Sequence, residues 1–114
     1  MPITFDDFQK IDIRLGTIVK AERNTKARKP AYKLWVDLGE LGIKQSSAQI
    51  TELYALETIV GKRVICVVNF EPMKVAGFKS EVLVTGFYNA KNQVALATMD
   101  PTYAGDIVNG SKLA

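Results

Sequence analysis

Apolar and polar side chains alternate along several short segments of this chain, which is the pattern of β-strands that bury one face. The longest such segment starts near residue 11, and its apolar side chains fall on odd positions: Ile11, Ile13, Leu15, Val19 and Ala21. Gly16 lies inside it, and a glycine within a strand commonly marks a bulge or a sharp bend. Ile18 breaks the alternation, so we expect its side chain to point outward.

Other segments bounded by turn residues predict further strands. They lie at Tyr32–Leu38, Ile43–Ile50, Val64–Val68, Val82–Val84 and Val94–Thr98. Near the N-terminus, Thr4 is followed three residues later by Asp7. This spacing is a capping signature, and it predicts a short helix that begins just after Thr4.

Residues 51–54 and 56–60 separate the third predicted strand from the fourth, and each predicts a short helical turn. Residues 70–79 contain Pro72 and Gly77, so we expect a shaped loop there instead of continuing sheet. A helix between the third and fourth strands is typical of the oligosaccharide/oligonucleotide-binding (OB) barrel. The sequence therefore predicts an all-β, five-stranded OB-fold barrel with short helices at the N-terminus and between strands 3 and 4.

The composition fits one globular domain spanning residues 1–114, with 47% hydrophobic and 24% charged residues. There is no histidine, and the only cysteine, Cys66, lies in an apolar run, which excludes an intramolecular disulfide and a zinc cluster. No phosphate loop or nucleophile motif occurs. We therefore expect a non-enzymatic protein without metal or cofactor. Without a leader-like or membrane-spanning run, we expect it in the cytoplasm.

Several side chains are candidates for contact with a polypeptide or with the bases of a nucleic acid: Trp35, Gln45, Ser47, Gln49, Phe70 and Phe78. Trp35 falls on the polar face of its strand, where a flat ring supplies contact area, and the amide and hydroxyl groups offer hydrogen bonds without charge. Two alternatives stay open. In one, Phe70 and Phe78 cap the barrel core; in the other, Trp35 lies beneath a loop or a second subunit.

Cations are concentrated between residues 20 and 33, where they accompany a single acid, Glu22: Lys20, Arg23, Lys26, Arg28, Lys29 and Lys33. The formal net charge of the whole chain is only +3, so most of the excess charge lies in this segment. Such a basic rim suits a phosphate-bearing or acidic partner. The alternative is a charged loop that is simply solvated.

Three separated motifs resemble a known family. The segment Phe8–Glu22 (FQKIDIRLGTIVKAE) resembles the opening of the tRNA-binding OB domain that occurs free or appended to methionyl- and phenylalanyl-tRNA synthetases. Within that superfamily the chain is more similar to the CsaA group, the export-related bacterial chaperones. This similarity lies in IKQSSAQIT at residues 43–51, VVNF at 67–70 and AGFKSEVLV at 76–84.

The resemblance implies an OB-fold homodimer, joined through its terminal additions, that binds unfolded or precursor polypeptides in support of protein export. The secretion motor is a candidate partner. The implied polypeptide-binding surface comprises Trp35, Gln45, Ser47, Gln49, Asn69, Phe70, Phe78, Lys79 and Ser80. The expected dimer interface comprises Phe5, Phe8, Ile18, Tyr103, Ile107 and Val108.

The alternative hypothesis is a tRNA-binding protein that recognises tRNA shape through the basic rim, with Trp35 stacked on a base. Family members that grip tRNA look like S-E-G-M where this chain has Ser80-Glu81-Val82-Leu83. Salt dependence separates the two hypotheses, because phosphate contacts weaken steeply with salt and apolar contacts do not.

Overall fold

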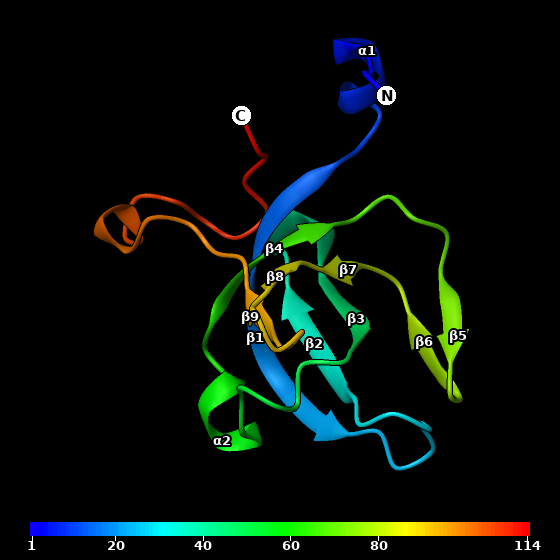
Figure 1. Cartoon of the computed structure of the whole chain (residues 1–114). Helices are drawn as coiled ribbons and strands as arrows, with labels where there is room; N and C mark the ends of the chain where they lie inside the picture. The colour runs from blue at the N-terminus through cyan, green and yellow to red at the C-terminus, as the bar shows by residue number, and fades with distance from the viewer.

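One long strand, β1 (Ile13–Arg23), organises the barrel because each half of it pairs with a different neighbour. The computed structural model describes residues 1–114. The first half of β1 pairs with β4 (Arg63–Val67) and the second half with β2 (Tyr32–Asp37), both antiparallel. The sheet continues to β3 (Ile43–Ala48) and β7 (Leu83–Val84) in the order β3-β2-β1-β4-β7. It curls into a nearly closed barrel (Figure 1), which confirms the predicted all-β fold.

Gly16 and a bulge bend β1 around the core. A Cβ atom at Gly16 would lie 2.5 Å from Val36 Cγ1 and 3.0 Å from the carbonyl oxygen of Asp37, so only glycine permits this close approach of β1 and β2. The pairing register shifts between Ile18 and Lys20, and Ile18 is 0% exposed. The expectation that Ile18 points outward is wrong, because the bulge reverses the alternation. Ile18 is therefore unavailable to a dimer interface.

A single apolar cluster fills the barrel. Its fully buried members include Leu34 and Val36 of β2, Val64 and Cys66 of β4, and Ile59 of the short helix α2 (Leu56–Ile59). α2 is the predicted helix between strands 3 and 4, whereas residues 51–54 form a turn and not the predicted helix. Burial raises the pKa of the Cys66 thiol to about 12, so the thiol stays protonated and unreactive near neutral pH.

Two small hairpins extend from the barrel: β5 (Met73–Val75) with β6 (Phe78–Ser80), and β8 (Gly86–Tyr88) with β9 (Val94–Leu96). The first hairpin lies where we predicted a loop, so that prediction is wrong. Its turn residues Ala76 and Gly77 have φ values of 48° and 80°. Positive φ at both central positions is the geometry of a type I′ turn, which suits the twist of paired strands. Alanine seldom adopts positive φ, so this turn has a weak sequence signal.

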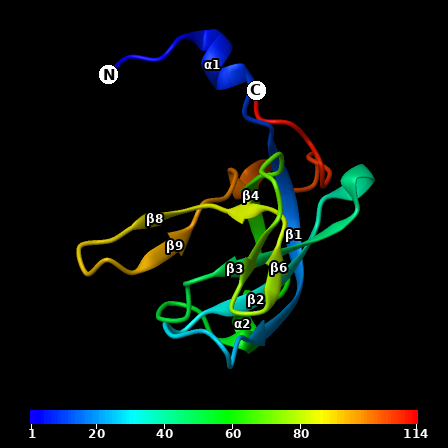
Figure 2. The same cartoon turned by 90° about the vertical axis from the view of Figure 1, so that its right-hand side faces the viewer.

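α1 (Phe5–Gln9) begins with the predicted capping box. The hydroxyl oxygen of Thr4 accepts a hydrogen bond from Asp7 N–H (3.1 Å), and the Asp7 carboxylate accepts one from Thr4 N–H (3.2 Å). The helix projects away from the barrel (Figures 1 and 2), and Phe5 and Phe8 are 70% and 38% exposed. α1 thus carries rings that the barrel does not cover. Nowhere in the chain is there a helix with the length and apolar character needed to cross a membrane.

The C-terminal segment lies beside the first half of β1. Gly110 N–H donates to the carbonyl of Leu15 (2.7 Å), Leu15 N–H to that of Ser111 (3.0 Å), and Leu113 N–H to that of Ile13 (2.9 Å). These bonds use the edge of β1 that β2 leaves free, since β2 pairs with β1 only from residue 17 onward. The two terminal segments therefore lie at the same end of the barrel (Figure 2).

Arg63 fixes the chain just before that contact. Its guanidinium donates to the carbonyl oxygens of Ala104 (2.8 Å) and Ile107 (2.6 Å) and to the side-chain oxygen of Asn109 (3.2 Å). This segment contains the 3-10 turn η2 (Pro101–Tyr103), and a similar turn, η1 (Gly39–Leu41), follows β2. One side chain from β4 thus orders a segment that has no strand of its own.

Candidate functional site

The β5–β6 hairpin covers the outer face of β2, and Trp35 and Phe78 meet beneath it. Their ring centroids are 5.4 Å apart in an edge-to-face arrangement, and Phe78 is only 8% exposed. Lys20 Nζ lies 4.6 Å from the centre of the Trp35 ring, and Lys33 Nζ lies 5.6 Å from that of Phe78. The two rings predicted as an open binding surface thus form an aromatic–cation cluster in which Trp35 is half-buried and Phe78 has little surface left for a partner.

Gln45 joins β3 to this cluster. With its amide oriented to satisfy both neighbours, its oxygen accepts a hydrogen bond from Trp35 Nε1 (3.2 Å) and its nitrogen donates to the carbonyl of Lys79 (2.9 Å). The predicted Gln45 amide is therefore occupied within the chain. The side chain of Lys79 remains exposed on β6.

Ser80 and Glu81 close the barrel between β6 and β3. Ser80 Oγ accepts a hydrogen bond from Ser47 N–H (3.1 Å), and Glu81 Oε1 accepts one from Gln45 N–H (3.1 Å). In return, the N–H groups of Glu81 (2.8 Å) and Val82 (3.2 Å) donate to the carbonyl of Gln45. Side chains thus complete a ladder that backbone pairing alone does not. Ser80, predicted as a polypeptide-binding residue, thus makes a structural contact with β3.

An open cavity remains beside this closure, and Phe70 and Met73 form its rim with 57% and 66% of their surface exposed. We call it the Phe70 cavity. Its volume is about 370 Å³, and its lining is Ser47, Phe70, Glu71, Met73, Val75, Ser80, Glu81, Val82 and Leu83. Of the predicted side chains, it brings together Ser47, Phe70 and Ser80. The cavity is apolar with two carboxylates, which suits an uncharged or cationic chain better than a phosphate.

A second cavity, the seam cavity, adjoins the first and shares Ser47 and Leu83 with it. It has a volume of about 480 Å³ and lies between β3 and the β7–β8 segment. Its lining is Ser47, Ala48, Gln49, Ile50, Leu83, Val84, Thr85, Gly86, Tyr88 and Val94, with no charged side chain among them. The predicted residue Gln49 lies here, away from Trp35.

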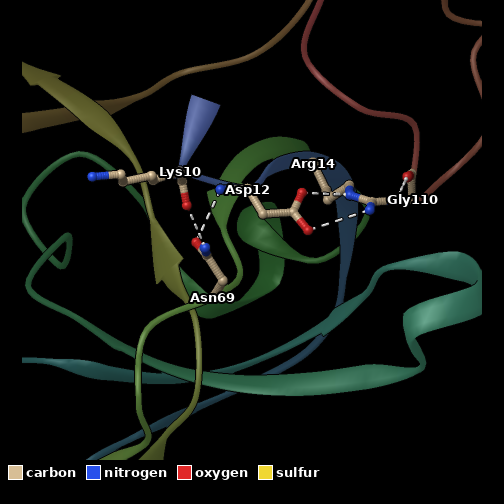
Figure 3. A network of polar contacts seen from close by, with 5 residues as sticks. All are labelled: Lys10, Asp12, Arg14, Asn69 and Gly110. Atoms are coloured by element: carbon tan, nitrogen blue, oxygen red, sulfur yellow. Dashed lines mark hydrogen bonds and ion pairs between the residues drawn. The ribbon is translucent and has the colours of Figure 1, made fainter. Parts of the chain in front are cut away.

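Asn69 has no place in either cavity. Its side-chain oxygen accepts from Asp12 N–H (2.9 Å), and its side-chain nitrogen donates to the carbonyl of Lys10 (2.7 Å), as Figure 3 shows. In the same network, Arg14 Nε donates to the Asp12 carboxylate (2.7 Å) and Arg14 also donates to the carbonyl of Gly110 (3.0 Å). The hydrogen bond from Arg14 lowers the pKa of Asp12. Asn69 thus links the N-terminal segment to the barrel.

The predicted basic rim is held in place by Asn24, which is 5% exposed. Its carbonyl-type side-chain oxygen accepts from Lys26 N–H (3.1 Å), and its amide nitrogen donates to the carbonyl of Val75 in β5 (3.4 Å). A Cβ at Gly77 would lie 3.5 Å from Lys26 Cδ, so the basic loop and the β5–β6 turn are neighbours. The cations therefore gather beside the Trp35 cluster, with Arg28 and Lys29 exposed on the loop.

The family model described as a putative tRNA binding domain matches residues 13–107. The chain belongs to this family. It is 41% identical over 108 residues to a methionine–tRNA ligase from Methanococcoides burtonii and 34% identical over 112 residues to one from Thermotoga maritima. These matches cover 94% and 98% of this chain but only 16% and 17% of the ligases, so the chain spans about a sixth of their length.

Two solved structures resemble this member of the tRNA-binding domain family over essentially its whole length. The chaperone CsaA from Bacillus anthracis is 45% identical with a TM-score of 0.90, and each chain covers 100% of the other. A CsaA chaperone protein from Picrophilus torridus is 44% identical with a TM-score of 0.89, covering 99% of this chain and 100% of that one. The resemblance to the CsaA group seen in the sequence is thereby confirmed.

The terminal segments of this family member form an apolar face at one end of the barrel. A cavity of about 240 Å³ there is lined mainly by apolar side chains of α1, β1 and the C-terminal segment, including Phe5, Phe8 and Leu113. Three more predicted interface residues lie on the C-terminal segment and are 56%, 36% and 73% exposed: Tyr103, Ile107 and Val108. We call this surface the terminal face.

The predicted polypeptide-binding surface did not include the residues that open the two cavities, namely Met73, Leu83 and Tyr88. Leu83 follows Val82, which is 5% exposed, and is itself 47% exposed, so strand alternation was an available signal for it. Met73 and Tyr88 have no such signal, because their exposure depends on hairpins. No three histidine, cysteine, aspartate or glutamate side chains lie close enough to hold a metal ion.

Proposed function

We propose that this chain is a non-enzymatic chaperone that binds extended segments of unfolded or precursor polypeptides in support of protein export. The observation that carries the proposal is the match to two CsaA chaperones, at 45% and 44% identity over the whole fold. The Phe70 cavity supports it, because two exposed apolar side chains border a space with an apolar floor and hydroxyl groups at its edge. The chain is proposed to act as a single domain, with the secretion motor as a candidate partner.

The proposal includes a homodimer formed through the terminal face. α1 projects from the barrel with Phe5 and Phe8 uncovered, and Tyr103 and Val108 are also more than half exposed. Exposed apolar side chains on the two terminal segments favour association, and a self-complementary two-fold contact is the commonest solution. Ile18 is excluded from this interface by its burial.

The test is a binding titration with a labelled unfolded peptide across a salt series. If peptide covers the exposed 57% of Phe70, roughly 100 Å² of apolar surface leaves water, which contributes about 2.5 kcal/mol before ordering costs. Phe70→Ser is therefore expected to weaken binding at least tenfold. Phe87→Ser is the matched control, since Phe87 is 73% exposed and lines neither cavity. Equal affinities of the two variants would refute the proposed site.

tRNA binding is the second candidate, and the position of the cations favours it. Lys20 and Lys33 lie against the Trp35 cluster, and the loop with Arg28 and Lys29 lies beside it. A steep fall of tRNA affinity with salt is expected for phosphate contacts, and Arg28→Ala/Lys29→Ala should reduce the log–log slope by about 1 to 2. tRNA binding with that slope, together with undetectable peptide binding, would replace the chaperone proposal.

A further inference from the structure

Two strand edges face each other across the seam cavity without hydrogen bonds between them. β3 is tied to residues 80–82 through Gln45 and Ser47. Beyond Ser47 no further hydrogen bonds join the two edges, and a cavity of about 480 Å³ lies between residues 47–50 and the β7–β8 segment. A strand edge that is left unpaired exposes backbone donors and acceptors in a regular row.

The β3 edge presents such groups at the carbonyl of Ser47 and at Gln49. Ser47 N–H donates to Ser80 Oγ and not to β2, so the backbone groups of Ser47 point away from β2. The same alternation directs Gln49, two residues later, toward the cavity. The N–H of Gln49 has no hydrogen-bond partner in the structure.

The opposite edge presents Gly86 and Tyr88. Ala97 N–H donates to the carbonyl of Thr85 (3.0 Å), and Asn89 N–H donates to that of Gln93 (2.9 Å). These two pairs fix the hydrogen-bonded positions of the β8–β9 ladder at odd residues of β8. The N–H and C=O groups of Gly86 and Tyr88 therefore point away from β9, and both residues line the seam cavity.

The side chains around the cavity indicate what can occupy it. Leu83 and Tyr88 are 47% and 76% exposed, and no lysine or arginine lines the cavity. Within the seam cavity a nucleic acid would find no cation for its phosphates, and the adjoining Phe70 cavity carries the carboxylates of Glu71 and Glu81. A third cavity, which shares Gln49 and Tyr88 with the seam cavity, is lined by Lys29 together with Glu52. An extended polypeptide needs the groups that are present, namely backbone partners for its own backbone and apolar surface for alternate side chains.

We infer that a bound polypeptide lies extended in the seam cavity as an added β-strand, hydrogen-bonded to the free edge at Gln49 or at Gly86 and Tyr88. Its alternate apolar side chains contact Leu83 and Tyr88 and continue toward Phe70. This inference rests on the proposed chaperone function and specifies how the polypeptide is bound: through its backbone, and so with little dependence on its sequence.

The experiment compares Gln49→Pro with Gln49→Ala in the full chain. Proline removes the Gln49 N–H, which has no partner in the free protein, at the end of a strand edge where proline is tolerated. Alanine keeps the N–H and measures the contribution of the side chain. The probe is a short labelled peptide in which valine alternates with serine, together with a copy N-methylated at alternate residues. Amide hydrogen exchange is followed with and without peptide.

We expect Gln49→Pro to bind the peptide about fivefold more weakly than Gln49→Ala, the equivalent of one hydrogen bond of about 1 kcal/mol. N-methylation should weaken binding tenfold or more, and the amides of Gln49, Gly86 and Tyr88 should become protected only in the complex. The N-methylated peptide decides the matter if Gln49→Pro fails to fold.

Two results overturn the inference in distinguishable ways. If the N-methylated peptide binds with the same affinity as the unmodified one and the three amides stay unprotected, the added strand is refuted but the chaperone proposal is not. Absence of peptide binding to the unmodified chain, or protection of the same amides by a short RNA alone, refutes both.

Discussion

Glu81→Ala is expected to weaken the closure of the barrel. Glu81 Oε1 accepts the hydrogen bond of Gln45 N–H at 3.1 Å, and the substitution leaves that donor without a partner while the reverse bond from Glu81 N–H to Gln45 is kept. A hydrogen bond to a charged group contributes about 1.5–3 kcal/mol when buried. This one is partly buried, so we expect the free energy of unfolding to fall by about 1–2 kcal/mol.

Glu81→Gln is the matched variant, because it keeps an oxygen in the same position and loses only the charge. We expect it to cost less than half as much as Glu81→Ala. The assay is urea unfolding at one fixed protein concentration, since the stability of an oligomer depends on concentration. A loss below about 0.5 kcal/mol for alanine would show that water replaces the carboxylate and that the closure does not depend on Glu81. Equal losses in the two variants would show that the uncharged amide oxygen does not sustain the hydrogen bond.

Three further outcomes follow from the packing and the charges. Gly16→Ala should cost about 1–3 kcal/mol by urea unfolding, because its Cβ would lie 2.5 Å from a core methyl group, whereas Gly105→Ala, with nothing within 4 Å, should be neutral within about 0.5 kcal/mol. The hydrogen bond from Arg14 lowers the pKa of Asp12, so its contribution to stability is present above the unfolded pKa of about 3.9 and is lost as pH falls through the folded pKa. Asp12→Asn should therefore lose less stability than the unmodified chain between pH 6 and pH 3 in the same assay. Cys66, with a pKa of about 12, should resist iodoacetamide at pH 8 and react only in urea, and fast alkylation of the folded chain would contradict its burial.

Local signals were sufficient to predict much of the fold. The capping box at Thr4 involves only residues within one helical turn, and the alternation in Tyr32–Leu38 reflects a strand that buries one face, so both were visible in the sequence. Ile18 was misplaced because a bulge depends on how β1 pairs with two neighbours at once. Pairing of that kind is a property of the tertiary structure, and alternation along one strand does not contain it.

The candidate site was harder to predict because a hairpin decides which side chains are exposed. Trp35 and Phe78 were both predicted as binding residues, and their rings meet where the β5–β6 hairpin packs on β2. The turn of that hairpin depends on positive φ at Ala76. Phe70 lies outside that hairpin and remains 57% exposed. The sequence therefore identified candidate side chains, but it did not show which of them the hairpin covers.

The hairpin also divides the molecule into two chemically different surfaces. On one side, Lys20 and Lys33 pack against the Trp35 cluster beside the basic loop. On the other side, the Phe70 and seam cavities contain carboxylates or no charge at all. Apolar burial depends little on salt and phosphate contact depends on it steeply, so a salt series distinguishes binding at the two surfaces. Substitutions at Phe70 and at Arg28 therefore report on separate surfaces, and each proposed activity can be removed without the other.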